Sequence, residues 1–592
     1  MSEEMGERSS KQSGTANLSP LTGERFFFIP KIGNEVVAME QMLDITMGRL
    51  LEQRVREFPD LDAVVYPHQG IRWSWAQFNG IVDRAARGFL AMGVKKGDHV
   101  AIWATNHPEW LICQFATAKI GAVLVTVNTN YKIFEAEYLL KQSDSTTLVL
   151  IEGFKDSHYV EIIQQLCPEL QTTEPGKLVS EKFPFLKNVI LIGKDRQPGM
   201  YLFDDLYEMA GRVEADKLEE IQQGLDPHDV INMQYTSGTT GFPKGVMLTH
   251  YNVINDGKMI GDCMEFTERD RLCIPVPLFH CFGCVLGVMA AVTHGTTMVM
   301  VHYFQPVPVM EAVQMERCTA VHGVPTMFIA MLGHSDFKKF DFSSLRTGIM
   351  AGSPCPTSVM RQVVDEMNMT EITIAYGQTE SSPVVTQTRT HDPLEKRVAT
   401  VGKKLPNMEV KIINPETGED APVHTQGEIV ARGFMVMKGY YKMPEATRQA
   451  IDENGWLHTG DLGTMDEEGY FKITGRLKDM IIRGGENIYP REIEEFLFTH
   501  PAVKDVQVVG VPDKTYGEEV MAFVIKKPGL DVTAEELVTY TRERLSRHKA
   551  PRYVQFIDEY PMTASGKIQK YKLREMGIAA MKLEEAAAIE TA

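Results

Sequence analysis

Apolar positions in the first third of the chain follow two different spacings. Residues 78–89 carry apolar side chains at the intervals of an amphipathic helix. Near-continuous apolar runs at 99–104, 122–127 and 147–151 are typical of strands buried on both faces. A helix-like stretch at 110–120 separates the first two runs. This strand–helix–strand repetition predicts a parallel sheet covered by helices, which binds ligands beyond the carboxyl ends of its strands.

In the last fifth of the chain the apolar pattern predicts shorter helices and strands. Residues 490–499 predict a short helix, and 503–511 and 520–526 predict strands. A further helix is expected to begin at Thr533, where Thr533 and Glu536 have the spacing of a capping box. These short elements predict a compact α+β domain.

We therefore predict an α/β protein with two domains, because 592 residues are too many for one core. Residues 41–475 are expected to form a large N-terminal domain of stacked, mostly parallel sheets flanked by helices. Residues 476–592 are expected to form a small C-terminal α+β domain. Residues 1–40 predict a disordered tail and lead-in, since the start of the chain is acidic, polar and rich in Ser and Gly.

Composition narrows the classes of function. The chain has 43% hydrophobic and 24% charged residues, which is typical of a globular protein. Its net charge of -18 argues against a general nucleic-acid binder, whose affinity comes from Lys and Arg. No apolar run reaches the ~18 residues of a membrane span. The N-terminal segment lacks the marks of a secretory or transit peptide, so we expect a cytoplasmic location.

Eight cysteines are scattered along the chain, which suits free thiols in a reducing compartment. Cys281 and Cys284 form a CxxC after His280, but no second pair follows at the spacing of a zinc finger. The apolar run 281–292 around them predicts a buried core helix. We therefore favour a packing role for this pair over zinc or redox chemistry.

The most informative segment runs from Tyr235 to Gly245, with the sequence YTSGTTGFPKG. Glycines let backbone amides approach a ligand closely, while Ser and Thr add hydroxyl donors and Lys244 adds a cation. This combination suits a polyphosphate. β-prone residues before the segment and the apolar run 246–248 after it predict that it joins two strands, unlike a Walker loop, whose Gly and Lys spacing also differs. Taken alone, a flexible Gly/Thr turn is the competing interpretation.

Three later motifs carry groups that suit the rest of a nucleotide. In the string IAYGQTE, Tyr376 can stack on adenine, Thr379 can donate to an α-phosphate, and Glu380 is a hard oxygen ligand for Mg²⁺. In WLHTGD, Asp461 is a carboxylate that can accept from ribose hydroxyls. In TGRLKD, Arg476 supplies a fork-shaped cation for the ribose and phosphate region.

Taken together and in this order, these segments closely resemble the motifs of the adenylate-forming superfamily, which contains acyl-CoA synthetases, luciferases and peptide-synthetase adenylation domains. The resemblance covers about 49–572 and includes IMAGSP, the run GRLKDMIIRGGENIYPREIE and the terminal PMTASGK. The chain looks most like the medium-chain fatty acyl-CoA ligases. The resemblance implies ATP, Mg²⁺ and coenzyme A as cofactors or co-substrates, and a small carboxylic acid as the group that is activated.

The resemblance also implies roles for individual residues. Lys567 would reach from the small domain to the carboxylate and α-phosphate oxygens, and Thr379 and Glu380 complete the predicted catalytic set, with Glu380 holding Mg²⁺. The predicted ATP-binding residues are Thr236, Ser237, Gly238, Thr239, Thr240, Gly241, Lys244, Gly352, Ser353, Pro354, Tyr376, Gly377, Asp461, Arg476 and Lys567.

Substrate and coenzyme A positions follow in the same way. Lys478 is at the position of the family's hinge, about which a mobile small domain would swing between the two half-reactions. The predicted acyl pocket consists of His280, Phe282, Gly283, Val324, Met350, Ala351 and Gly377. The predicted coenzyme A tunnel consists of Gly484, Gly485 and Glu486.

Several alternatives stay open at this point. An aryl-CoA ligase of the coumarate or benzoate type would share every motif, and a catalytically inactive nucleotide-binding relative is a more distant possibility. The locally basic segment 542–574 is either a solvated face or a contact for the nucleotide end of coenzyme A. The sequence does not predict the chain length of the acid. It also leaves the oligomeric state open, and a homo-oligomer is one of the alternatives.

Overall fold

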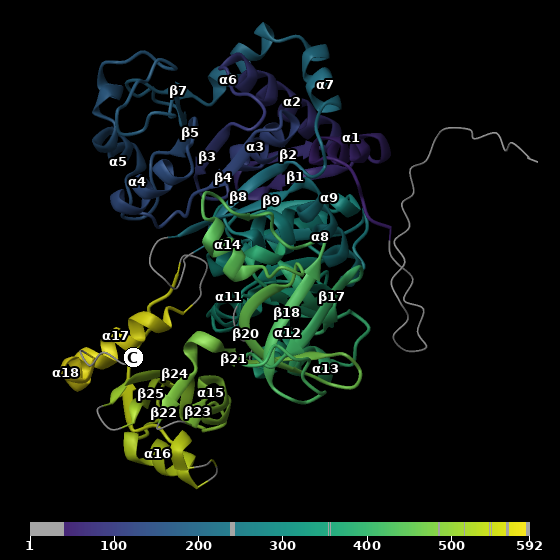
Figure 1. Ribbon diagram of the computed structural model, residues 1–592. Helices are drawn as coiled ribbons and strands as arrows, with labels where there is room; N and C mark the ends of the chain where they lie inside the picture. Colours follow the sequence, from purple (N-terminus) through teal and green to yellow (C-terminus); the bar gives the residue numbers. More distant parts are fainter. Residues whose placement is uncertain are drawn as a thin grey trace, which may run out of the picture. The chain divides into compact units, whose positions relative to one another are not determined.

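The computed structural model describes residues 41–236, 243–352, 355, 357–483, 486–513, 516–543, 545, 547–563 and 568–587. Helices and strands alternate through the first part of the chain, and mainly antiparallel strands follow (Figure 1). A smaller C-terminal region contains both helices and strands. The predicted mixed α/β class, with large sheets that are mostly parallel, is confirmed.

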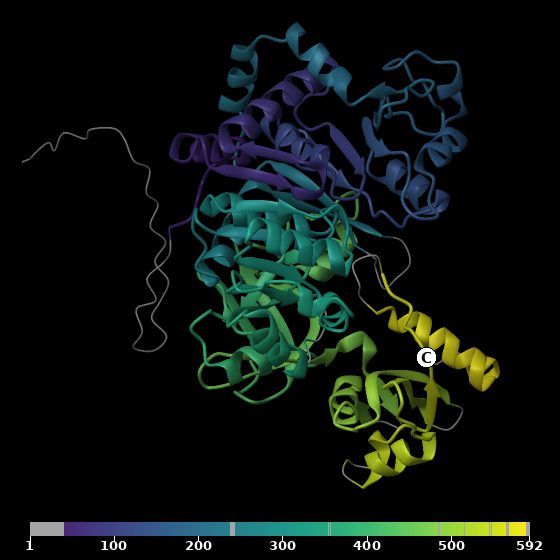
Figure 2. The same ribbon diagram turned by 180° about the vertical axis from the view of Figure 1, so that it is seen from behind.

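The larger of the two main sheets has nine strands among the described residues. Its central strands run parallel, and the edge pairs β14–β15, β15–β16 and β1–β2 are antiparallel. Strands from the start of the chain, in purple, lie beside teal strands from its middle (Figure 2). In sheet order the strands are β16 (Lys403–Lys404), β15 (Val384–Gln387), β14 (Glu371–Gly377), β13 (Thr347–Ala351), β12 (Ala320–Gly323), β10 (Arg271–Ile274), β11 (Thr297–Met300), β1 (Asp62–Tyr66) and β2 (Ile71–Ser74).

The second main sheet has eight strands among the described residues. All neighbours from β8 to β7 in this sheet are parallel, whereas β9 is antiparallel to both β8 and β19. In sheet order the strands are β19 (Gly439–Tyr440), β9 (Lys244–Thr249), β8 (Val230–Thr236), β4 (Val123–Thr126), β3 (His99–Trp103), β5 (Thr147–Ile151), β6 (Asn188–Ile192) and β7 (Tyr201–Leu202).

The three apolar runs predicted as buried strands become β3, β4 and β5, and they are parallel neighbours. Their residues are buried along nearly the whole length of each strand. This follows from the sequence, because strands covered on both faces need apolar side chains at every position rather than at alternate ones. The helix predicted before β4 also forms, as α3.

One continuous hydrophobic core connects the two main sheets. It contains Val100 and Val125 from the second sheet together with Ile349 and Ala351 from the larger one. A second cluster, which includes Met350, covers the opposite face of the larger sheet. Successive residues of a strand point to opposite faces, so β13 contributes to both cores.

Two further sheets are formed by the later part of the chain. The strands of the first, all antiparallel to their neighbours, are β17 (Met408–Ile413), β18 (Gly427–Gly433), β20 (Leu457–Met465) and β21 (Phe471–Arg476). Those of the second, in the C-terminal region, are β23 (Glu486–Ile488), β22 (Ile481–Arg483), β25 (Gly517–Lys526), β24 (Val503–Asp513) and β26 (Tyr553–Phe556).

Helices connect these strands. The predicted capping box is present at α16: the Glu536 amide donates to Thr533 Oγ1 at 3.2 Å, and Glu536 Oε2 accepts from the Thr533 amide at 2.8 Å. The α-helices are α1 (Met47–Glu57), α2 (Trp75–Ala91), α3 (Pro108–Lys119), α4 (Ile133–Gln142), α5 (Tyr159–Leu166), α6 (Asp204–Met209), α7 (Ala215–Gln223), α8 (His250–Cys263), α9 (Ala290–His294), α10 (Pro306–Glu316), α11 (Pro325–Leu332), α12 (Thr357–Met367), α13 (Leu394–Ala399), α14 (Pro444–Ala450), α15 (Pro490–Leu497), α16 (Ala534–Arg542), α17 (Lys570–Met581) and α18 (Glu584–Ala587).

The predicted core helix at 281–292 forms, but with a wider turn than expected. Residues Phe282–Met289 make a π-helix, which continues into α9, and all of its residues are buried. Gly283 is required inside it, because a Cβ there would lie 2.4 Å from the carbonyl oxygen of Pro277. Apolar composition predicted the burial of this segment but not its helix type.

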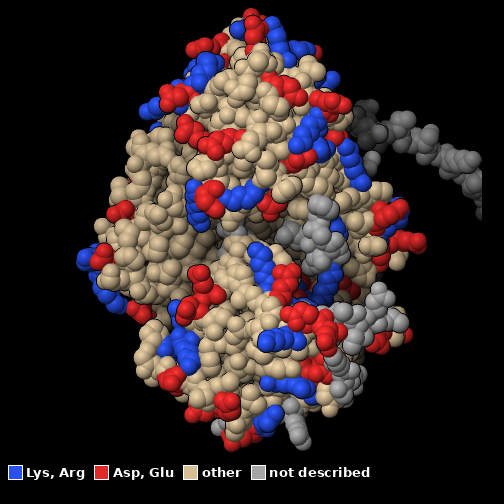
Figure 3. Space-filling model, turned by 90° about the vertical axis from the view of Figure 1, so that its left-hand side faces the viewer, with Lys and Arg blue, Asp and Glu red and all other residues tan. Residues whose placement is uncertain are grey.

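Charged side chains of both signs are interspersed on the face shown in Figure 3. Across the part of the chain that the structure describes, no helix combines the length and the apolar character that crossing a bilayer requires.

Lys119 is fully buried between α1, α2 and α3. Its ammonium donates to Asp83 at 2.6 Å, to Asn79 at 2.8 Å and to Glu52 at 3.2 Å. A buried ammonium is tolerated only when its donors are satisfied in this way. The three bonds therefore tie the first helices of the chain together.

We expect Lys119→Met to lower the free energy of unfolding by about 3 kcal/mol, because Asp83 loses its cation and Glu52 keeps only its pair with Arg49. Urea titration followed by circular dichroism measures the change. Lys177→Met is the control, since the Lys177–Glu174 pair is largely exposed and its loss should leave the stability unchanged. Equal effects of the two substitutions would contradict this account of Lys119.

Candidate functional site

The glycine-rich segment joins two strands, as predicted. Strands β8 and β9 are antiparallel, and Thr236 at the end of β8 is opposite Lys244 at the start of β9. Both residues are partly buried. The predicted phosphate-binding residues between them, Ser237, Gly238, Thr239, Thr240 and Gly241, lie outside the described residues.

The carboxyl ends of β12, β13 and β14 meet at one edge of the larger sheet. These strands are parallel neighbours, with Gly323 beside Met350 and Ala351 beside Ala375. The segments that follow them carry predicted site residues from three distant parts of the sequence. Parallel pairing therefore brings together groups that the chain keeps far apart.

Packing at this edge places three predicted residues in contact. Gly352 has a φ of +89°, and a Cβ there would lie 3.2 Å from Val324 and 4.0 Å from Phe282. Val324, Phe282 and Ala351 all belong to the core between the main sheets. Ser353 and Pro354 lie outside the described residues.

Met350 does not share this surface. Its side chain is fully buried in the cluster on the other face of the larger sheet. The reason is the alternation of side chains along β13, which sends Ala351 toward Phe282 and Met350 away from it. The prediction that grouped Met350 with Ala351 in one pocket wall is therefore not supported for its side chain.

His280 lies immediately before the π-helix. Its Nδ1 accepts from the backbone N–H of Phe282 at 3.1 Å, which fixes the ring at the start of that helix. Cys281 Sγ lies 3.7 Å from Thr379 Oγ1, so this helix start is next to the turn that follows β14. His280 and Thr379, predicted for the acyl and phosphate ends of the site, thus belong to one neighbourhood.

The turn after β14 depends on Gly377. A Cβ at this position would lie 1.8 Å from the carbonyl oxygen of Pro383. With glycine, the chain enters the 3-10 helix Thr379–Ser381 directly after the strand. Thr379 is buried there, and Glu380 is partly exposed.

Asp461 joins two other predicted nucleotide-binding residues. Its buried carboxylate accepts from the Tyr376 hydroxyl at 2.9 Å and from Arg476 Nε at 2.7 Å. Asp461 and Arg476 are directly opposite each other on β20 and β21. Attraction to Asp461 raises the pKa of Arg476, and burial together with this carboxylate raises the pKa of Tyr376 well above its usual value. The phenol is therefore a neutral donor.

Glu380 and Lys244 are joined through Tyr440, a residue that the sequence did not single out. The Tyr440 hydroxyl donates to Glu380 Oε1 at 2.7 Å. The Lys244 ammonium lies 4.8 Å from the centre of the Tyr440 ring. The only sequence signal around Tyr440 was a glycine- and tyrosine-rich patch, which does not indicate what Tyr440 contacts.

A second contact that the sequence did not signal supports the same turn. Asp256 is fully buried on α8 and accepts from the Val384 N–H at 3.1 Å, a few residues after Glu380. Burial raises the pKa of Asp256 well above its usual value. A single acid in an apolar helix carries no pattern from which this contact could be predicted.

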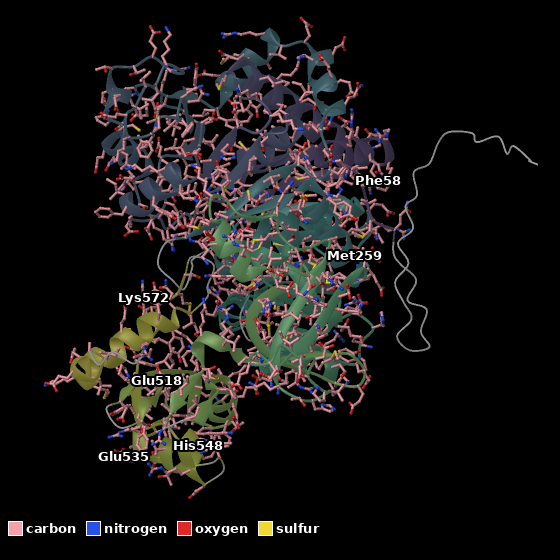
Figure 4. The ribbon with its side chains drawn as sticks, in the orientation of Figure 1. Phe58, Met259, Glu518, Glu535, His548 and Lys572 are labelled. Atoms are coloured by element: carbon pink, nitrogen blue, oxygen red, sulfur yellow. The ribbon has the colours of Figure 1, made fainter. Side chains whose placement is uncertain are left out.

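In the C-terminal region much of the predicted basic segment is neutralised locally. Carboxylates of the same region pair with its side chains, and Glu518, labelled in Figure 4, is one of them. The pairs are Lys549–Glu492 (2.7 Å), Arg552–Glu519 (3.4 Å), Lys570–Glu494 (2.6 Å) and Arg574–Glu518 (2.6 Å). These four cations are therefore not a free basic face.

The remaining predicted residues of this region are described only in part. Lys478 lies in the 3-10 helix Leu477–Asp479. Glu486 begins β23, with only its backbone described. Gly484, Gly485 and Lys567 lie outside the described residues.

A cavity of about 420 Å³ lies elsewhere, beyond the carboxyl ends of β3, β5 and β6. His107 and His302 line it with ring centres 4.0 Å apart, and burial lowers the pKa of His107 to about 3. The predicted site residues are not part of this lining.

Comparison with known proteins agrees with the motifs. The model of the AMP-binding enzyme family matches residues 51–441, and that of the AMP-binding enzyme C-terminal domain matches residues 492–567. The first match alone spans more than half of the chain. This chain belongs to the AMP-binding enzyme family.

Relatives of this AMP-binding enzyme carry acyl-CoA synthetase or ligase names. It is 59% identical to "Putative acyl-CoA synthetase YngI" of Bacillus subtilis (strain 168), covering 91% of this chain and 98% of that protein. It is 44% identical to "Medium-chain acyl-CoA ligase ACSF2, mitochondrial" of Danio rerio, covering 90% and 88%. Among solved structures, the anthranilate CoA ligase AuaEII in complex with anthranoyl-AMP matches with a TM-score of 0.80 at 25% identity, covering 92% and 99%.

In this AMP-binding enzyme, Gly377→Ala should lower the free energy of unfolding by about 2 kcal/mol, because the new methyl group overlaps the Pro383 carbonyl. Thermal melting and urea titration measure the effect. Gly80→Ala is the matched control: it lies in α2 with open space at the Cβ, so the fold should gain about 0.5 kcal/mol. A neutral Gly377→Ala would show that the turn after β14 is looser than described.

Proposed function

We propose that this protein is an ATP-dependent acyl-CoA synthetase that activates a medium-chain fatty acid. The carboxylate attacks the α-phosphorus of ATP and pyrophosphate leaves, which gives an acyl-adenylate. The thiol of coenzyme A then attacks the acyl carbon and AMP leaves. The observation that carries the proposal is the joining of Tyr376, Asp461 and Arg476 by hydrogen bonds, with Thr379 and Glu380 in the turn after Tyr376.

Each group in this arrangement has a chemical role in the first step. Asp461 can accept from the ribose hydroxyls, while the faces of Tyr376 suit the adenine ring. The segment from Thr236 to Lys244 is assigned to the β- and γ-phosphates. Thr379 and Lys567 are assigned to the α-phosphate, where donors and cations stabilise the charge that grows as pyrophosphate leaves.

Glu380 is the residue assigned to Mg²⁺. Its carboxylate fits that role: Tyr440 is bonded to Oε1, and among the described residues no donor is bonded to Oε2. Such an ion is usually held by one or two carboxylates and by substrate phosphates, rather than by a cage of side chains. When bound, it would neutralise charge on the triphosphate.

The second step requires Lys567 to leave the reacting centre so that the thiol can enter. We therefore assign the small mobile domain to residues 476–592, with its hinge at Lys478, and the large domain to residues 41–475. Gly484, Gly485 and Glu486 are assigned to the coenzyme A tunnel. The separate family match over residues 492–567 is consistent with such a unit.

Apolar pocket walls favour a monocarboxylic acid with an alkyl chain. Phe282, Val324 and Ala351 supply such walls, and His280 lies at their polar end. The name of the Danio rerio relative points to medium chains. Binding of anthranoyl-AMP by a structural neighbour keeps an aryl-CoA ligase as the second candidate. We propose the cytoplasm as the location, although the Danio rerio relative is named as mitochondrial.

A panel of acids separates the two candidates. We expect AMP release dependent on coenzyme A to be at least about 10-fold faster, by kcat/KM, with octanoate or decanoate than with benzoate, coumarate or anthranilate. Acid-dependent exchange of pyrophosphate into ATP is the parallel measurement. An aromatic acid as best substrate would establish the second candidate, and no exchange with any acid would indicate an inactive nucleotide-binding protein.

Lys567→Ala should slow adenylate formation by about 10²–10³-fold, comparable to the loss of one oxyanion donor. Thioester formation from preformed acyl-adenylate should be much less affected, because the lysine acts only in the first step. Lys527→Ala is the control, since Lys527 is exposed and lies outside the basic segment 542–574, so both half-reactions should stay unchanged. Equal losses in both half-reactions of Lys567→Ala would contradict its assignment.

A further inference from the structure

Tyr440 connects charged groups that come from different sheets. It lies on β19, at the edge of the eight-stranded sheet, and its backbone pairs with Val246 of β9. Its hydroxyl donates to Glu380 Oε1 at 2.7 Å, beyond the end of β14 in the other main sheet. Its ring lies 4.8 Å from the ammonium of Lys244. A single, nearly buried side chain thus contacts both an acid and a base that are assigned to the triphosphate.

Backbone contacts fix the position of this side chain. The Tyr440 N–H donates to Thr447 Oγ1 at 2.9 Å, and the next amide, that of Tyr441, donates to the Gly245 carbonyl at 2.8 Å. On the other side, the Met437 N–H donates to the backbone oxygen of Glu380 at 2.9 Å. The segment around Tyr440 is therefore attached to the backbone of Glu380 and to the neighbour of Lys244.

The direction of the hydrogen bond follows from protonation. The Tyr440 phenol has one proton to donate, whereas an ionised carboxylate such as that of Glu380 can only accept. The phenol therefore keeps its single proton and donates it to Oε1. A hydrogen bond to a charged carboxylate is stronger than one between neutral groups, so it can fix the orientation of the carboxylate plane. Oε2 is then the oxygen that can face a ligand.

The ring has a separate effect on Lys244. An ammonium over the face of a tyrosine ring is attracted by the negative charge of that face. Without this contact, the four-carbon side chain would lose rotamer entropy each time it met a phosphate. The ring therefore holds the cation near the start of β9, close to the loop assigned to the β- and γ-phosphates.

We propose that Tyr440 is a positioning residue for the metal–triphosphate unit: its hydroxyl presents one oxygen of Glu380 to a divalent cation, and its ring holds Lys244 ready for the phosphates. The inference rests on the ATP use proposed above. It predicts separate effects on ATP binding, because the hydroxyl acts through the metal and the ring acts without it. Substitution of a tyrosine with only a packing role would change binding equally with and without the metal.

Equilibrium binding of ATP, without any acid substrate, tests the hydroxyl. Isothermal titration calorimetry is carried out once with EDTA and once with excess Mg²⁺, which gives two dissociation constants. The constant in EDTA divided by the constant in Mg²⁺ measures how much the metal contributes to binding. We expect Tyr440→Phe to reduce this ratio by about 10-fold, the effect of one hydrogen bond to a charged group. Affinity in EDTA should stay within about 2-fold of the wild type, because the ring remains.

Two further variants test the ring and the partner. Tyr440→Leu should also weaken ATP binding in EDTA, by about 3-fold, since Lys244 loses its aromatic contact. In a Glu380→Gln background, Tyr440→Phe should have no additional effect on the Mg²⁺ ratio, because the carboxylate through which it acts is gone. Additive losses in that background would overturn the inference.

Tyr441→Phe is the matched control. Tyr441 is the adjacent residue, and its hydroxyl donates to Asp144 at 2.9 Å rather than to a residue of the site. It should change neither dissociation constant, and melting temperatures of all variants should confirm that they are folded. An equal effect of Tyr441→Phe would assign the change at Tyr440 to packing and overturn the inference.

The outcomes also separate this inference from the proposed function. If the wild type binds ATP with Mg²⁺ and Tyr440→Phe binds it equally well, the positioning role is wrong and the function stands. If the wild type binds no ATP in either condition, both are wrong. A reduced ratio with unchanged affinity in EDTA supports the positioning role.

Discussion

Parallel pairing of β12, β13 and β14 is the constraint on which the candidate site depends. Adjacent parallel strands present their carboxyl ends at the same edge, so the residues after each strand converge regardless of their separation in sequence. Val324 follows β12, Gly352 follows β13 and Tyr376 lies at the end of β14, so all three share this edge. The edge tolerates little variation in side-chain volume, since Gly352 adopts a left-handed backbone and Gly377 touches the Pro383 carbonyl. Chemistry at this edge is therefore built on close backbone packing.

Much of this arrangement could be predicted because its signals are local. Every residue of β5 after Thr147 is apolar, so the sequence predicts its boundaries as the structure has them. The capping box at Thr533 and Glu536 needs only a three-residue spacing. The two strands around the glycine-rich segment were likewise visible as apolar runs on either side of it. The family motifs then supplied the roles that spacing alone could not.

What the sequence could not show depends on contacts between distant elements. Met350 and Ala351 look equally apolar, yet strand alternation sends them into different cores, and only the placement of β13 within its sheet decides which one faces Phe282. Tyr440 and Glu380 are 60 residues apart, and their bond requires an edge strand of one sheet to pass beside the end of a strand in the other. Four basic side chains of the C-terminal region could have contacted coenzyme A by sequence alone, but in the structure each pairs with a carboxylate of the same region.

The same combination of groups occurs twice around the proposed nucleotide site. Asp461 has a phenol donor in Tyr376 and a cation in Arg476, while Glu380 has a phenol donor in Tyr440, whose ring carries the cation Lys244. A site for a triphosphate has to limit its own negative charge, because uncompensated carboxylates would repel the ligand. Cations provide that compensation. The phenols add orientation without adding charge, since burial raises the pKa of each and keeps it protonated. Each carboxylate is thus fixed in direction by a neutral phenol, while its cation is either paired with it directly, as Arg476 is with Asp461, or held on the phenol ring, as Lys244 is beside Glu380. The remaining lone pairs of each carboxylate suit a hydroxyl or a metal ion.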